Sequence, residues 1–125
     1  MRDNLKKRPN LPNEILKGVS SVEEDFQNKV VRPIVKMQSD LLIAHLHHQL
    51  KSSKILLDQL DLIKKEAALT YLFTKNQAFK REINGMVIGH FTLEEYNKYL
   101  DFSKEINRRI TLIVLNRCSD LILNR

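Results

Sequence analysis

The chain has 125 residues, of which 42% are hydrophobic and 29% are charged, and its formal net charge is +6. These values suit one soluble domain that needs neither a metal nor disulfides in order to fold. No apolar run approaches about 18 residues, so we expect no membrane insertion. The single cysteine, Cys118, excludes an intrachain disulfide, and the N-terminus is not a secretory signal, so we expect a cytoplasmic protein.

Residues 1–20 show no hydrophobic period and contain two prolines and a glycine, which predicts a flexible N-terminal arm. Half of the net charge lies in its first ten residues, where four basic side chains outweigh Asp3: Arg2, Lys6, Lys7 and Arg8. Basic side chains bind phosphates in a salt-dependent way. One hypothesis is therefore an accessory nucleic-acid binder that uses this arm weakly, although a basic tail is more often simply solvated.

Residues 21–51 are predicted to form one long helix. It begins with the capping box Ser21-Val22-Glu23-Glu24. At helical spacing the buried stripe is expected to comprise Phe26, Val30, Ile34, Met37 and Leu41. Pro33 removes a helical hydrogen bond and predicts a kink, which either bends the helix around the core or opens a groove; the bend is the favoured reading.

Two short helices are predicted next, over residues 62–74 and 77–89, capped by Asp61 and Asn76. They could also be one bent helix. The expected inward residues are Leu62, Leu69, Leu72 and Phe73 in the first, and Phe79, Ile83, Met86, Val87 and His90 in the second. Residues 52–60 connect them to the first helix, with an apolar patch at 55–57 that tucks inward. The GxxxG spacing of Gly85 and Gly89 predicts a close helix contact or a loosened helix end.

A second capping box, Thr92-Leu93-Glu94-Glu95, begins the last predicted helix over residues 93–123, about 46 Å long at 1.5 Å per residue. Phe91 and Tyr96 have the spacing of a hydrophobic staple. The expected buried stripe is Tyr96, Tyr99, Leu100, Ile106, Ile110, Ile113, Val114 and Leu121. With only three glycines and three prolines, the chain is predicted to be all-α, a small bundle of two long helices bracketing two short ones within residues 21–125.

The segment AHLHHQ, Ala44 to Gln49, holds three histidines. On the helix wheel His45 and His48 fall on the buried stripe, and His47 points to solvent. Two imidazoles three residues apart could bind one metal, with His90 as a third ligand. However, Asp40 lies on the opposite face and there is no HExxH motif. We therefore favour a buried pair with hydrogen-bonded rings over a metal site, and we expect no cofactor.

Other signals of catalysis are weak, because the chain has no GxGxxG, P-loop or GxSxG motif. Cys118 is expected to be a packing residue, and Arg108 and Arg109 a solvated face. Arg117 falls in the apolar stripe, so it must reach outward or pair with an acid. These residues favour a protein that is not an enzyme.

The last helix carries more apolar residues than one buried face requires, and this predicts an interaction surface. The surface would include Leu112 and Leu123 opposite the stripe, Leu115 and Ile122 between, and Ile43 and Leu50 on the outer side of the first helix. We expect a homodimer or a docked partner helix, unless the N-terminal arm covers this surface. The leading hypothesis is thus a cytoplasmic interaction or homo-oligomerisation module.

Three stretches resemble a family of small bacterial helical proteins: Phe26 to Pro33 (FQNKVVRP), Ile34 to Leu42 (IVKMQSDLL) and Gly85 to Leu100 (GMVIGHFTLEEYNKYL). The resemblance extends over most of the chain after residue 20 and implies an all-helical fold. Some members carry the name glyoxalase, so that activity belongs with the metal-binding or enzymatic alternative built on His45, His48 and His90. The resemblance implies no catalytic residues of its own.

Overall fold

The structure is a computed structural model and describes residues 21–123, so the predicted flexible arm, residues 1–20, lies outside the described residues. The described part is all-α and contains no strand, as predicted. Its elements in chain order are α3 (Val22–Phe26), η2 (Gln27–Val31), α4 (Arg32–Met37), α5 (Ser39–Ser52), η3 (Leu57–Gln59), α6 (Leu62–Lys75), α7 (Gln77–Ile88), α8 (Leu93–Tyr99), η4 (Leu100–Phe102) and α9 (Ser103–Leu123).

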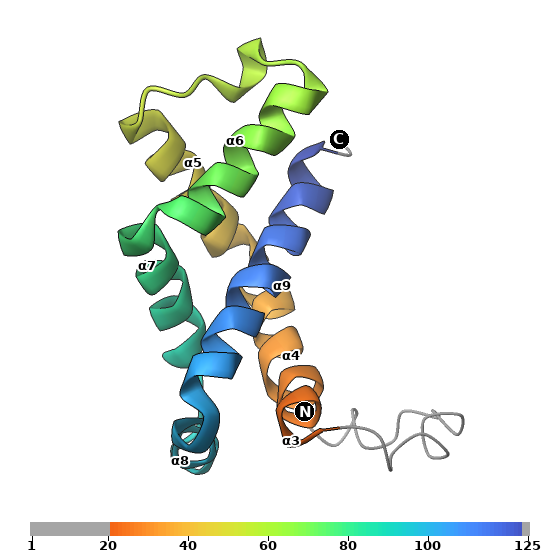
Figure 1. Cartoon of the computed structure of the whole chain (residues 1–125), viewed down its shortest axis with the longest axis vertical. Helices are drawn as coiled ribbons and strands as arrows, with labels where there is room; N and C mark the ends of the chain where they lie inside the picture. The colour runs from red at the N-terminus through yellow and green to blue at the C-terminus, as the bar shows by residue number, and fades with distance from the viewer. Residues whose placement is uncertain (1–20, 124–125) are drawn as a thin grey trace, which may run out of the picture.

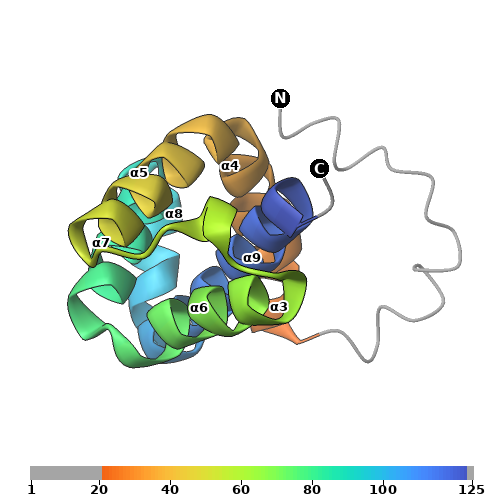
Figure 2. The same cartoon turned by 90° about the horizontal axis from the view of Figure 1, so that it is seen from above.

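The last helix, α9, is the element around which the bundle is built. It packs against α4, α5, α6 and α7, and it crosses the middle of the molecule in Figures 1 and 2. Three of its residues at a spacing of four, Ile106, Ile110 and Val114, are completely buried. This apolar stripe faces the buried residues of the other helices, so one core serves the whole domain.

The first long helix is irregular in two places. A π-helical turn, η2, lies immediately before Pro33 and widens the helix where the proline ring would otherwise meet the preceding turn. The helix then breaks at Gln38, whose backbone (φ −100°, ψ 16°) is not helical, and α5 begins at Ser39. The predicted single helix over residues 21–51 is therefore two segments, with a second discontinuity that the sequence analysis did not include.

These two irregularities decide which face is buried. Buried residues recur every fourth position on both sides of the break: Phe26, Val30, Ile34, Leu42, Leu46 and Leu50. On a regular helix each such step drifts by about 40°, because 3.6 residues make one turn. The π turn and the break absorb this drift. The predicted stripe followed the regular period instead, and its members Met37 and Leu41 are wrong, at 58% and 55% exposed.

Side-chain caps separate the remaining helices. Asp61 Oδ1 accepts from the amide of Lys64 (2.8 Å) and Asn76 Oδ1 from that of Phe79 (2.9 Å), so α6 and α7 are distinct helices, as their caps predicted. The capping box at Thr92 is complete, with both reciprocal hydrogen bonds present. At Ser21 the structure shows the serine half of the predicted box, a bond from the amide of Glu24.

The connection between α5 and α6 begins with a residue in the left-handed region. Lys54 has φ 61°, and the amide of Ile55 next to it donates to the carbonyl of Leu50 (2.9 Å), which closes the end of α5. The predicted inward patch is partly correct: Leu57 is buried and Ile55 packs against the core, while Leu56 is exposed.

Aromatic side chains close the end of the bundle where α3 and α8 lie (Figure 1). Phe26 makes edge contacts with Phe91 and Phe102, and Phe91 also contacts Tyr99. These rings are contacts of Phe91, and its predicted staple contact with Tyr96 stays a prediction. Some expected core residues are exposed instead because they lie on the outer faces of short helices: Leu62, Leu100, and in part Tyr96.

Candidate functional site

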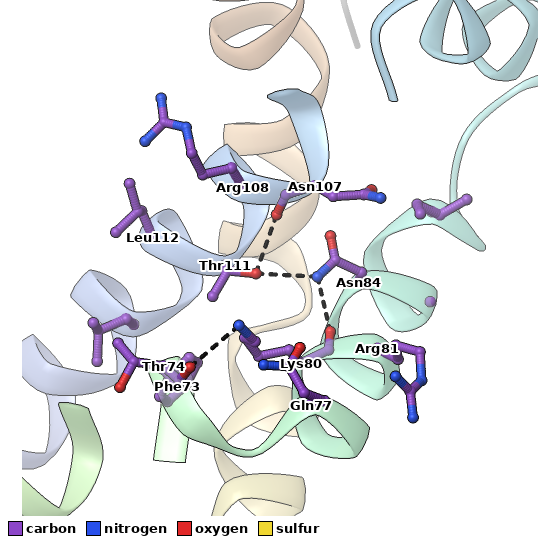
Figure 3. Close-up of a pocket in the computed structure, with 13 residues that line it drawn as sticks. Phe73, Thr74, Gln77, Lys80, Arg81, Asn84, Asn107, Arg108, Thr111 and Leu112 are labelled. Atoms are coloured by element: carbon purple, nitrogen blue, oxygen red, sulfur yellow. Dashed lines mark hydrogen bonds between the residues drawn. The ribbon is translucent and has the colours of Figure 1, made fainter. Parts of the chain in front are cut away.

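A pocket of about 760 Å³ lies between the end of α6, the length of α7 and the middle of α9 (Figure 3). The break at Asn76 lets α6 and α7 contact α9 separately, so the space between them is not filled by one continuous helix. Gly85 lines this pocket, and a Cβ atom added there would meet nothing within 4 Å. A helical position without a side chain therefore contributes to the hollow.

The pocket wall is largely apolar. Phe73 is fully buried in the core beneath it, Ile88 and Leu115 are partly buried and pack against the core, and Leu112 is 44% exposed. The GxxxG motif is therefore not a close helix contact at Gly85. Its second glycine, Gly89, is the C-cap of α7, which agrees with the alternative of a helix end before Thr92.

One buried polar side chain lies in this wall. Asn84 is 9% exposed, and its Nδ2 donates to the carbonyl of Lys80 (2.8 Å) and to Thr111 Oγ1 (3.1 Å). Thr111 in turn donates to the carbonyl of Asn107 (3.1 Å), which orients the hydroxyl (Figure 3). The Asn84 Oδ1 is buried and has no partner within residues 21–123. An unsatisfied buried acceptor costs about 1–3 kcal/mol, so this position is expensive for the fold.

Three cationic side chains lie along the pocket: Lys80, Arg81 and Arg108. Lys80 is half-buried, and its Nζ donates to the Thr74 carbonyl at the end of α6 (3.3 Å). Arg108 forms a two-point ion pair with Glu105 on its own helix (3.1 and 2.7 Å). Hydrogen bonds from Arg108 and then Arg109 lower the pKa of Glu105 from 4.5 to about 2. Glu105 itself is not among the lining residues.

The predicted histidine site is not assembled. His45 is half-buried and its Nε2 lies 2.7 Å from Glu82 Oε1, with its ring stacked on Phe79. His48 is exposed, and its ring centroid lies 6.4 Å from that of His45. His90 is also exposed and follows the end of α7. Within residues 21–123 no three His, Cys, Asp or Glu side chains are placed to hold a metal ion.

The prediction of a buried histidine pair is therefore wrong for His48, because the break at Gln38 turns that face outward. His45 does find a hydrogen-bond partner, but it is a carboxylate on α7, 37 residues away, that the sequence analysis did not consider. His47 is exposed, as predicted.

The predicted interface residues fall into three groups. Leu112 is exposed, whereas Leu50 is only 2% exposed and cannot contribute to an outer surface, since the same break at Gln38 turns it inward. The others are partly buried and pack against the core of this chain: Ile43, Leu115, Ile122 and Leu123. Leu50 is therefore wrong as an interface residue, and an interface that uses the other five stays a prediction. The homodimer itself stays a prediction.

Two other side chains of α9, Arg117 and Cys118, had been assigned roles from the sequence, and the structure shows the partner of the first and the burial of the second. Arg117 Nε donates to the hydroxyl of the buried Ser39 (2.9 Å), which itself donates to the carbonyl of Val35, so the guanidinium pairs with a hydroxyl at the start of α5 and not with an acid. Cys118 is buried, as expected of a packing residue, and desolvation raises the pKa of its thiol to about 11.

A comparison of the chain with protein-family models, with curated proteins and with solved structures found no match. Membership of the bacterial helical family thus stays an expectation. None of the helices between residues 21 and 123 is long and apolar enough to cross a bilayer. The basic side chains proposed for nucleic-acid binding, Arg2 to Arg8, lie outside the described residues, so that hypothesis also stays a prediction.

Proposed function

We propose that this protein is a small-molecule-binding protein whose ligand occupies the pocket between α6, α7 and α9. The observation that carries the proposal is the hollow itself: apolar side chains and the hydrogen-bonded pair Asn84 and Thr111 line it, and a Cβ atom at Gly85 would meet nothing within 4 Å. Ligand pockets commonly measure about 300–1,000 Å³ and combine apolar walls with a few convergent polar groups. A volume of about 760 Å³ falls within this range.

The functional groups along the pocket support binding over catalysis. They are amides, hydroxyls and cations from residues such as Asn84, Thr111 and Lys80, and these bind and orient a ligand. The one titratable group with a strongly lowered pKa close by, Glu105, is held in an ion pair with Arg108. A carboxylate held in this way is a weak base, so it is a poor candidate for proton abstraction.

Gly85 offers a direct test, because it lines the pocket and a Cβ atom added there would meet nothing within 4 Å. The probe is N-phenyl-naphthylamine, a neutral apolar dye whose fluorescence rises in an apolar site. We expect Gly85→Phe to weaken its binding at least tenfold by filling the pocket. The matched control, Gly85→Ala, adds only a methyl group and improves helix propensity, so its affinity should stay near that of the wild type.

Circular dichroism establishes that both variants remain folded. The proposal fails if the wild-type chain does not bind the dye, or if folded Gly85→Phe binds it as tightly as the wild type does.

A further inference from the structure

From the charge and polarity of the pocket we infer the chemical class of its ligand: an amphipathic organic anion with an apolar body. This inference rests on the proposed function, since it concerns the same pocket. It adds the sign of the ligand's charge and the residue that recognises it, Lys80.

The charged side chains that line the pocket are all cationic. Lys80, Arg81 and Arg108 are among its 13 lining residues, and no aspartate or glutamate is. An apolar pocket bordered by one sign of charge attracts the opposite charge, because the low-dielectric wall screens the field less than water does. The cationic side chains would repel a cationic ligand, and a neutral ligand would gain no electrostatic attraction from them.

Lys80 is the best placed of the three cations. Arg108 is already engaged by Glu105, and Arg81 is exposed, with its side chain drawn away from Thr111 in Figure 3. Lys80 is half-buried, and its ammonium uses one donor on the Thr74 carbonyl. An ammonium has three donors, so two remain for an anion.

The remaining groups describe the rest of the ligand. Lys80 and Asn84 are four residues apart and lie on the same face of α7, so one molecule can reach both. Ile88, Leu112 and Leu115 provide the apolar contact for its body.

A pair of dyes tests this inference. Anilinonaphthalene sulfonate has an apolar ring system, an N–H and an anionic group, and N-phenyl-naphthylamine has the same parts without the anion. We expect the wild type to bind the sulfonate more tightly. We expect Lys80→Gln to weaken sulfonate binding roughly three- to tenfold, as for a partly exposed charged contact, and to leave the neutral dye unchanged. The matched control is Lys64→Gln, the same change at an exposed position in the first turn of α6.

The outcomes separate this inference from the proposed function. If both dyes bind in a manner that Gly85→Phe abolishes, but with equal affinity and no selective effect of Lys80→Gln, the pocket binds ligands and the anion inference is overturned. If Gly85→Phe affects neither dye, both proposals fail. If Lys80→Gln does not fold, the salt dependence of dye binding to the wild type is the test. Added sodium chloride must weaken binding of the sulfonate and leave binding of the neutral dye unchanged. An equal response of the two dyes overturns the inference.

Discussion

Replacing Asn84 by leucine is expected to make the protein more stable and less able to bind. The substitution removes two neutral hydrogen bonds, to Thr111 and to the Lys80 carbonyl, worth about 1 kcal/mol each. It also removes the unsatisfied buried Oδ1, which costs about 2 kcal/mol, and gains a few tenths of a kcal/mol in helix propensity. Thr111 keeps the carbonyl of Asn107 as its acceptor. The net expectation is a stabilisation of a few tenths of a kcal/mol.

Urea unfolding followed by circular dichroism measures this change, since the chain has no tryptophan for fluorescence. Asn116→Leu is the matched control, the same change at an exposed residue of α9 outside the pocket lining, where the effect should stay within about 0.5 kcal/mol. Binding of anilinonaphthalene sulfonate should weaken in Asn84→Leu and not in the control. A loss of more than about 1 kcal/mol of stability in Asn84→Leu would refute the reasoning, because it would mean that the amide stabilises the fold.

Four further outcomes follow from single side chains. Leu112→Glu should weaken binding of the neutral dye with no change of mass in light scattering, because Leu112 lines the pocket; a halved mass would support the predicted dimer. Arg108 holds the pKa of Glu105 at about 2, below its ordinary value of 4.5. The ion pair therefore stabilises the fold fully above pH 4.5, and this stabilisation is lost as the pH falls toward 2. Parallel acid-unfolding curves of the wild type and Glu105→Gln would contradict this. Lys54→Gly should raise the free energy of unfolding by about 0.5–1 kcal/mol, since φ is 61° there; urea unfolding that shows no gain would count against strain at this residue. Cys118 should react with a thiol reagent near neutral pH only after unfolding, because burial raises its pKa to about 11; rapid labelling of folded protein would be inconsistent with its burial.

Local signals predicted the helices well because each depends on residues close together in the chain. The caps at Asp61, Asn76 and Thr92 form as the sequence indicated. The regular helical period could not predict which face of α5 is buried. Buried positions every four residues, from Phe26 to Leu50, fit a helix only if it is widened or broken, and the break falls at Gln38, which has no proline or glycine to mark it.

The pocket was missed because its residues come from three helices whose packing the sequence does not specify. Its traces were nevertheless present. The apolar surplus on the last helix predicts an interaction surface for a second copy or a partner helix, and two of its residues, Leu112 and Leu115, line the pocket. The GxxxG spacing predicts a close helix contact or a loosened helix end; Gly89 does end α7, and Gly85 leaves open space. The histidines drew attention as candidate ligands, yet His48 and His90 are exposed.

Two features that weaken the fold occur at adjacent positions of α7. Gly85 lies inside a helix, where it costs about 1 kcal/mol relative to alanine, although a methyl group would meet nothing within 4 Å. Asn84 beside it leaves a buried acceptor unpaired, although a leucine would remove that cost. Neither choice improves packing, and both residues line the same pocket. Departures from local stability rules are expected where function requires them, so their coincidence here is an argument for a binding site that is independent of the pocket's volume.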